Sequence, residues 1–170
     1  MYKNFKKVFI IFLFIIHSSV SQSHESVAYI NIDYLLNNSI FGKQIINKLK
    51  AINEKNINQI KIIESKIKKK ETKLLNEKNI LSDEVYKDKI NTLKAEINKF
   101  RIENEQNNKK FQKIKKDEFN DFLNQIQPII NGYMKENSIN VLLDKKNIFV
   151  GKSELDITDK ILNIVDQKIN

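Results

Sequence analysis

The sequence predicts a mainly α-helical fold with a small β body, in which a long antiparallel helical hairpin, or coiled-coil arm, projects from a short-stranded oligomerisation body. The 170 residues contain only three Gly and one Pro, too few turn residues for a multi-stranded barrel or sandwich. Apolar residues also recur at alternating spacings of three and four through two long stretches of the chain, which is the pattern of a coiled-coil seam. A chain of this length predicts one folded unit.

The first 23 residues are typical of a secretory signal peptide. Residues 1–7 carry three lysines and no acid, residues 8–16 form an unbroken apolar run, and small polar residues follow. This run is too short to cross a bilayer, which takes about 20 apolar residues. We therefore expect export to the periplasm, with cleavage after about Ser21 or Ser23. A buried N-terminal helix or an amphipathic anchor is the alternative.

Residues 24–40 predict the first strand and turn of the body. The segment VAYINI, residues 27–32, is rich in β-branched and aromatic residues and alternates between two faces, which predicts a short buried strand. Asp33 should then cap a brief turn, and Ser39 is a favourable N-cap for the helix that follows.

Residues 41–118 predict the arm, with its tip near residue 80. The first seam runs from Ile46 to Leu81 and the second from Tyr86 to Ile114, with seven apolar residues among eleven and seven among nine. Ser82, followed by two acids, is typical of the beginning of the second helix. Folding the chain at Ile80 pairs residues whose numbers sum to 160, and this pairing matches nearly all the apolar layers.

The same pairing brings four polar seam residues into one block, Asn53 and Asn56 with Asn104 and Asn107. Asn at the seam of a coiled coil costs stability and specifies register. Three interpretations stay open for this block. It is a register device, a bendable zone in the arm, or a simple consequence of how often Asn occurs in this chain.

Residues 119–170 predict the return helix, two strands and the C-terminal helix of the body. A broader apolar face continues from Phe119 to Met134 through Pro128, which should kink the helix. Strands are expected at 139–143 and 148–150, and Thr158 with Asp159 should cap the last helix. The predicted body and oligomer core consists of Val27, Tyr29, Ile30, Ile32, Ile139, Val141, Leu143, Ile148, Val150, Ile157 and Ile161. Such a core is marginal for a monomer, so we expect oligomerisation.

The sequence points away from catalysis, cofactors and metal sites. It has no Cys, and its only two histidines, His17 and His24, lie within the first 24 residues. Gly151-Lys152-Ser153 is similar to the end of a phosphate-binding loop, but the chain lacks the glycine that such a loop has five residues earlier. No nucleophile with a base partner can be assembled. We therefore predict that the protein is not an enzyme.

Most of the net charge outside residues 1–23 lies toward the predicted arm tip, out of a total of +9 for the whole chain. Without the three lysines of residues 1–23, the chain keeps 27 basic and 21 acidic residues, a net charge of +6, and residues 61–80 contribute +4 of it. Such a cluster attracts an anionic membrane or lipopolysaccharide. The candidate contacts are Lys66, Lys68, Lys69, Lys70, Lys73, Lys78, Lys87 and Lys89. An ordinary solvated helix face is the alternative, and export argues against nucleic acid as a partner.

Three segments carry a resemblance to a known family: VAYINIDYLLNNSIFGK near the mature N-terminus, ENSINVLLDKKNIFVG, and ELDITDKIL before the last helix. Together with the charged hairpin, they resemble the Skp/OmpH family of periplasmic outer-membrane-protein chaperones. The resemblance implies a Skp-like homotrimer whose strands form a shared β body and whose three arms enclose a cavity. It further implies that the cavity holds unfolded outer-membrane proteins without ATP for delivery toward the outer membrane, and that the basic tips meet membrane or lipopolysaccharide.

Two other functions fit the same sequence. The arm could serve as the rod of an envelope coiled-coil scaffold with one fixed partner, or the protein could bind membrane surfaces through its lysine-rich tip. Suppression of the aggregation of several unfolded barrels favours the chaperone, whereas tight binding to one folded partner favours the scaffold. The positive arm also predicts that binding to unfolded clients weakens at high salt.

Overall fold

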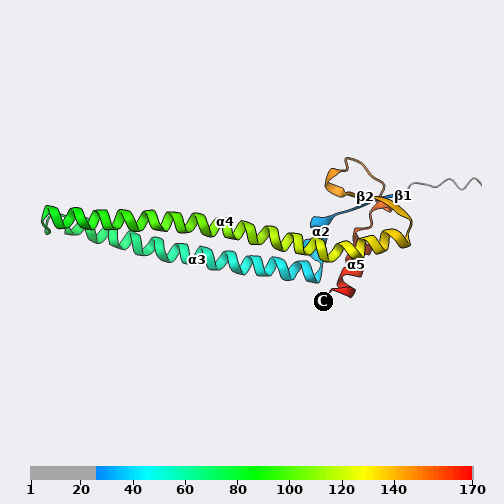
Figure 1. Ribbon diagram of the computed structural model, residues 1–170, viewed down its shortest axis with the longest axis horizontal. Coiled ribbons are helices and arrows are strands. Elements are labelled where there is room, and N and C mark those ends of the chain that lie inside the picture. The colour runs from blue at the N-terminus through cyan, green and yellow to red at the C-terminus, as the bar shows by residue number, and fades with distance from the viewer. Residues whose placement is uncertain (1–25, 170) are drawn as a thin grey trace, which may run out of the picture.

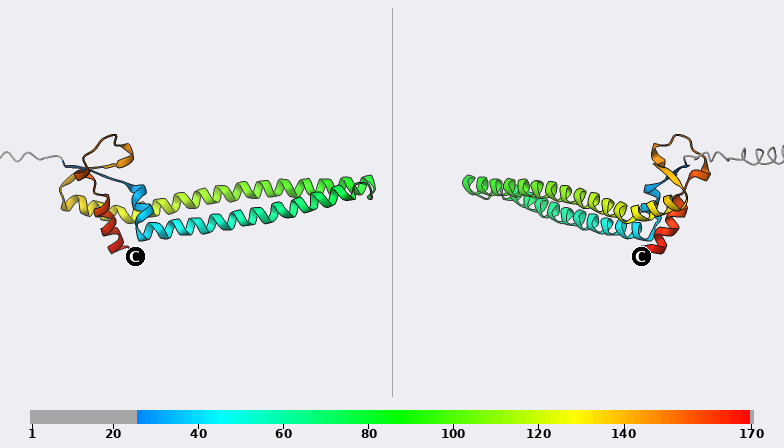
Figure 2. Two further views of the ribbon diagram at one scale, coloured as in Figure 1. Left: turned by 180° about the vertical axis from the view of Figure 1, so that it is seen from behind. Right: turned by 45° about the vertical axis from the view of Figure 1, so that its right-hand side comes forward.

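The computed structural model describes residues 26–169, as a small body with one long arm (Figure 1). In chain order the elements are β1 (Ser26–Ile30), α2 (Ile32–Asn38), α3 (Ile40–Glu77), α4 (Asp83–Glu136), β2 (Ile139–Asp144), two 3-10 turns (Lys145–Asn147 and Ser153–Leu155) and α5 (Thr158–Lys168). Further views show that α3 and α4 run side by side and that the other elements gather at one end of them (Figure 2). The predicted fold class is confirmed, while the expected leader lies outside the described residues.

The first strand is shorter than predicted, because a helix begins at Ile32. Asn31 is the N-cap of α2, and its side-chain oxygen accepts a hydrogen bond from the backbone N–H of Tyr34 at 2.9 Å. We expected Asp33 to cap a brief turn; instead it lies in the first turn of a seven-residue helix, where the helix dipole favours an acid. The helix buries Leu35 completely in the body.

Ser39 begins the first arm helix, as predicted. Its hydroxyl accepts a hydrogen bond from the backbone N–H of Gly42 at 3.0 Å, and Ser39 is fully buried. A second cap comes from α5, because the carboxylate of Asp166 accepts from the backbone N–H of Ile40 at 2.8 Å. A side chain does not fit at Gly42, since a Cβ atom there would lie 2.1 Å from the carbonyl oxygen of Leu36.

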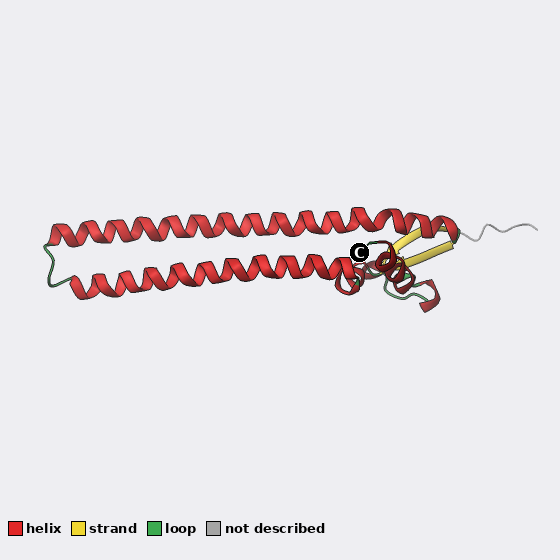
Figure 3. Cartoon of the chain, turned by 90° about the horizontal axis from the view of Figure 1, so that it is seen from below, coloured by secondary structure: helices red, strands yellow, loops and turns green. Residues whose placement is uncertain are grey.

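The arm pairs α3, of 38 residues, with most of α4, of 54 residues, through the turn 78–82 (Figure 3). Every apolar residue of the two predicted seams is half-buried, yet no residue from 46 to 121 is fully buried. In a pair of helices with no third helix packed against it, the seam remains partly exposed to solvent on both sides of the pair. The arm is therefore held by marginal packing, in contrast to the body.

Three ion pairs cross between the two arm helices. Lys48 pairs with Glu118 at 2.6 Å, Lys70 with Glu96 at 2.6 Å and Lys89 with Glu77 at 2.7 Å. The residue numbers of each pair sum to 166, against the 160 that we predicted for the apolar layers. Exposed lysines have long side chains that reach along the arm, so each pair joins residues that are offset from one another in the predicted register.

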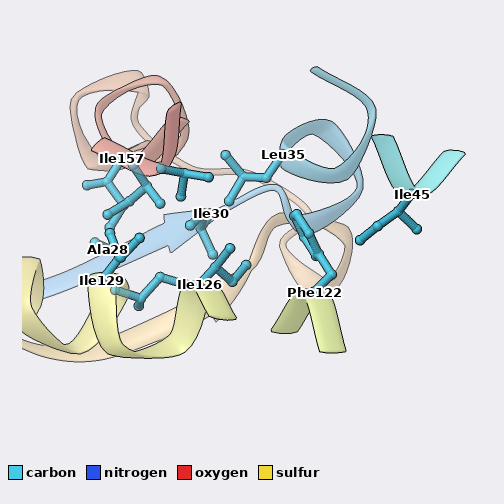
Figure 4. Close-up of a cluster of buried hydrophobic side chains, with 11 residues drawn as sticks. Ala28, Ile30, Leu35, Ile45, Phe122, Ile126, Ile129 and Ile157 are labelled. Carbon is cyan, nitrogen blue, oxygen red and sulfur yellow. The ribbon is translucent and has the colours of Figure 1, made fainter. Parts of the chain in front are cut away.

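The core lies in the body, where β1, α2, α5 and the return part of α4 meet (Figure 4). Leu35, Phe122, Ile126 and Ile161 are among its most deeply buried side chains. Phe41, at the beginning of α3, stacks on Phe122 with ring centroids 5.9 Å apart. This contact attaches the base of the arm to the core. The described residues contribute twelve buried apolar side chains to the core, a small number for a domain that folds alone.

Strands β1 and β2 form a two-stranded parallel sheet, in which Val27 is paired with Val141 and Tyr29 with Leu143. Parallel neighbours need a long connection, and here the whole arm lies between them in the chain. The strand predicted at 148–150 does not form: this segment is irregular and leaves Phe149 and Val150 102% and 81% exposed. A strand needs a neighbour with free backbone N–H and C=O groups, and no segment within residues 26–169 pairs with this one.

Candidate functional site: the arm, its tip and the open body surface

Glu77 links the two arm helices near the tip by pairing with two lysines. Its carboxylate lies 2.7 Å from the ammonium group of Lys89 on α4 and 3.7 Å from that of Lys73, one turn earlier on α3. The hydrogen bond from Lys89 holds the pKa of Glu77 below its usual value, although desolvation acts in the opposite direction. Glu77 is therefore charged at neutral pH and joins α3 to α4, while adding little stability because the pair is exposed.

The eight lysines predicted for the tip are all exposed on the distal part of the arm. Lys70 pairs with Glu96, and Lys73 and Lys89 share Glu77. Among the described residues, no ion pair is formed by the other five, which are Lys66, Lys68, Lys69, Lys78 and Lys87. Most of the positive charge of the tip is thus available to an anionic surface.

Three apolar side chains stand exposed among these lysines, and sequence reasoning missed them. Leu75, Ile80 and Val85 are 68%, 80% and 45% exposed. In the sequence they can be recognised as apolar residues that fall outside the three-and-four spacing of the two seams. Lysines around exposed apolar side chains form an amphipathic surface of the kind that binds anionic bilayers. We call these eight lysines and three apolar residues the tip surface.

A cavity of about 490 Å³ lies between α3 and α4 in the middle of the arm. All four asparagines predicted to form one block line this cavity: Asn53, Asn56, Asn104 and Asn107. Apolar seam residues such as Ile60 and Phe100 border it. The structure therefore brings the four asparagines together, at the one stretch of the seam where amides replace apolar side chains.

Asp156 joins three parts of the body. Its carboxylate lies 2.7 Å from the ammonium group of Lys145 and accepts hydrogen bonds from the hydroxyl and the backbone N–H of Thr158, the latter at 3.0 Å. The hydroxyl of Thr158 accepts in turn from the backbone N–H of Asn31, at 2.9 Å. The N-cap residue of α5 is Ile157, which makes no side-chain cap, and Asp156 just before it accepts from the first backbone N–H of the helix. The expectation that Thr158 with Asp159 caps α5 was wrong, because Thr158 is the first residue of the helix and its hydroxyl is engaged with Asp156 and Asn31.

Two opposing effects determine the charge on Asp156. Its partial burial would raise its pKa, but the hydrogen bonds from Lys145 and Thr158 outweigh that effect and hold the pKa below the usual 3.8. The same ion pair raises the pKa of Lys145. At neutral pH the segment that carries the ELDIT residues is therefore held by a charged pair, which gives this segment a structural role.

The residues predicted for the body and oligomer core lie in different environments. Tyr29, Ile30, Ile157 and Ile161 are buried, and Ile32, Ile139 and Ile148 are half-buried. The exposed ones are Val27, Val141, Leu143 and Val150, at 38%, 44%, 43% and 81%. Val27, Val141 and Leu143 share one face of the sheet, because side chains alternate along a strand and Val27 is paired with Val141. We call these three residues, together with Phe149 and Val150, the open body surface.

The described residues offer surfaces rather than an enclosed chemical site. From residue 26 to 169, no group of three or more His, Asp or Glu side chains is placed to hold a metal ion. Every buried side-chain nitrogen or oxygen in that range has a hydrogen-bond partner. None of the described helices combines the length and the apolar character that crossing a membrane requires.

Comparison with known proteins agrees with this architecture. Residues 26–165 match the family described as Outer membrane protein (OmpH-like). The crystal structure of a candidate outer membrane chaperone (OmpH-like) from Caulobacter crescentus CB15 is similar, with a TM-score of 0.77 and 17% sequence identity, over 85% of this chain and 85% of that chain. None of the curated proteins matches the chain. The structural likeness establishes the fold, and the family match, which covers nearly all described residues, supports a chaperone role. The chain therefore belongs to the OmpH-like family of outer membrane proteins.

Proposed function

We propose that this protein is an ATP-independent periplasmic holdase that binds unfolded outer-membrane proteins and delivers them toward the outer membrane. The observation that carries the proposal is the arm, where half-buried apolar residues and exposed lysines alternate and no residue from 46 to 121 is fully buried. Such a surface makes many weak contacts, which suits varied unfolded chains better than one fixed partner. Membership of the family supports the chaperone over the envelope scaffold.

The proposed assembly is a homotrimer joined through the open body surface. Val27, Val141 and Leu143 share one face of the sheet, and Phe149 and Val150 are two further exposed apolar side chains of the body. Exposed apolar patches of this kind mark interfaces, and the small core gains stability when a second and third copy cover it. Three arms on one shared body would then enclose the space that holds a client.

Mass and holdase activity test the two parts of this proposal separately. With residues 1–23 removed, we expect light scattering at micromolar concentration to give three times the mass of the chain. We also expect the protein, without ATP, to keep several urea-denatured outer-membrane barrels soluble after dilution. A monomer would contradict the trimer. Tight binding to one folded envelope protein, without suppression of aggregation, would establish the scaffold instead.

Long-range attraction should contribute to client capture, because residues 61–80 hold most of the net positive charge outside the leader. Raising the salt from about 0.05 M to about 0.5 M screens such attraction and should weaken client binding several-fold. An affinity that stays constant across this titration would remove electrostatics from the mechanism.

The tip surface supports a second activity, attachment to an anionic membrane. Its lysines provide attraction to lipid headgroups, and Leu75 and Ile80 provide side chains that enter the interface. We expect binding to vesicles of phosphatidylglycerol but not to vesicles of phosphatidylcholine, and weaker binding for Leu75→Ser with Ile80→Ser. The matched control is Ile62→Ser with Ile102→Ser, at exposed positions in the middle of the arm. Binding to lipopolysaccharide without binding to phosphatidylglycerol would assign the tip to that ligand alone.

A further inference from the structure

The cavity in the middle of the arm presents hydrogen-bonding groups that the described chain does not use. Among residues 26–169, no side-chain hydrogen bond involves Asn53, Asn56, Asn104 or Asn107, whereas the ion pairs of Lys48 and Lys70 lie on either side of the cavity. Each amide offers two donors and one acceptor. The cavity is therefore a place where side-chain donors and acceptors of two helices have no partner within the described chain, with Asn56 and Asn104 half-buried and Asn53 and Asn107 exposed.

The lining is almost neutral. Glu103 is its only ionisable side chain, and Gln59 and Asn108 add two more amides. Charge consequently does not select the ligand here, in contrast to the tip surface. The cavity would therefore recognise a ligand through amide groups, which both donate and accept hydrogen bonds.

Apolar side chains stand around the amides. Ile57 and Ile62 are 41% and 55% exposed and line the cavity from α3, and half-buried Phe111 lines it from α4. A volume of about 490 Å³ lies within the range of pockets that take up a drug-sized ligand, about 300–1,000 Å³. The space suits a short segment of extended chain, with room for its backbone and for small apolar side chains.

We propose that this amide-lined cavity binds an extended segment of unfolded polypeptide through the backbone N–H and C=O groups of the segment. Every non-proline residue of any client carries one such donor and one such acceptor, and in an unfolded chain they are unpaired within the chain. Recognition through the backbone tolerates any sequence, as a holdase requires, while Ile57 and Ile62 contact whichever apolar side chains follow. The inference rests on the proposed holdase function and names a place on the arm where the client is held.

A peptide and its N-methylated form test the backbone contact directly. The probe is an uncharged seven-residue peptide of Gly, Ala, Ser and Val, blocked at both ends, and its partner carries N-methyl groups at alternate residues. In ¹⁵N–¹H spectra of the full assembly, the side-chain amide signals of the four asparagines should shift saturably with the first peptide. The N-methylated peptide should bind about tenfold more weakly, because it lacks donors. Absence of shifts, or equal binding of the two peptides, would overturn the proposal.

Variants separate recognition by the cavity from a general effect of leucines on the arm. Asn56→Leu with Asn104→Leu removes two amides and fills the cavity with apolar side chains, whereas Asn58→Leu with Asn91→Leu makes the same change at two exposed arm positions outside the cavity lining. At about 0.5 M salt, where charge effects are screened, the cavity variant should bind a urea-denatured outer-membrane barrel about tenfold more weakly, and the control variant should bind like the unchanged protein. Equal behaviour of the two variants would overturn the proposal, since both replace two asparagines of the arm by leucine. If the unchanged protein fails to keep the barrel soluble, the proposed holdase function is refuted instead. The peptide experiment would still test whether the cavity binds an extended backbone.

Discussion

The carboxylate of Asp166 accepts a hydrogen bond from the backbone N–H of Ile40 at 2.8 Å, across 126 positions of the sequence. Through this contact α5, the last helix of the chain, caps the first turn of α3, the first helix of the arm. A helix N-terminus carries unpaired N–H groups and partial positive charge, so a carboxylate is well suited to this position. This cap and the Phe41–Phe122 stack both attach the base of the arm to the body.

Removing this cap should destabilise the protein. We expect Asp166→Ala to lower the free energy of unfolding by about 1 kcal/mol, as measured by urea denaturation followed by circular dichroism. Asp121→Ala, at an exposed position inside α4, is the matched control and should change the free energy by less than about 0.5 kcal/mol. Equal effects of the two substitutions would show that the cap does not stabilise the folded state.

Two glycines should respond in opposite directions to the same substitution. At Gly42 a Cβ atom would meet the backbone of Leu36, whereas at Gly132 no atom lies within 4 Å of it. Gly42→Ala should therefore destabilise the protein by about 1–3 kcal/mol through overpacking. Gly132→Ala should stabilise it by about 0.5–1 kcal/mol, because Gly is a poor residue inside a helix. Thermal unfolding of both variants tests this pair, and a stabilising Gly42→Ala would contradict the tight junction between α2 and α3.

The Asp156 contacts should make stability depend on pH in the acid range. Because the pKa of Asp156 lies below the usual 3.8 in the folded protein, the unfolded chain takes up this proton first as the pH falls. The contribution of the carboxylate is thus complete well above pH 3.8 and is lost as the pH drops through the folded-state pKa. Asp156→Asn should be less stable than the unchanged protein at pH 7, and the difference should shrink toward pH 3. Urea denaturation at several pH values measures it, and a constant difference would refute the assignment.

Two exposed side chains on the body should control assembly. Phe149 and Val150 belong to the open body surface, and covering a large apolar side chain contributes about 1.5–3 kcal/mol. Phe149→Ser with Val150→Ser should therefore make the proposed trimer dissociate at least tenfold more readily on dilution, as measured by light scattering. Ile102→Ser, on the exposed side of the arm, should leave the mass unchanged. If the double variant keeps the mass of the unchanged protein at every dilution, this segment lies outside the interface.

Much of the arm could be predicted because the sequence patterns that specify it involve residues close together in the chain. The three-and-four spacing predicted both helices, the hydroxyl of Ser39 predicted the beginning of α3, and the tip was expected near residue 80, within the observed turn 78–82. The four asparagines were expected in one block, and all of them line one cavity. Each of these features depends on residues a few positions apart or on the simple folding-back of one helix on another.

Parts of the body could not be predicted in the same way. The segment 148–150 has the composition of a strand, but composition does not supply a neighbouring strand with free backbone groups. Asp33 has the side chain of a cap, but Asn31 occupies the cap position. The tip lysines were visible in the sequence, whereas the exposure of Leu75 and Ile80 beside them depends on how the hairpin ends.

The sequence by itself determined the arm, because helical periodicity and the scarcity of Gly and Pro act over short distances along the chain. Only the tertiary structure decided which carboxylates cap which helices, since Asp166 meets Ile40 across 126 positions, and the Thr158 hydroxyl that Asp156 engages meets the N–H of Asn31 across 127. It also decided which apolar side chains of the body remain exposed, because burial depends on the neighbours that folding brings and not on the residue itself.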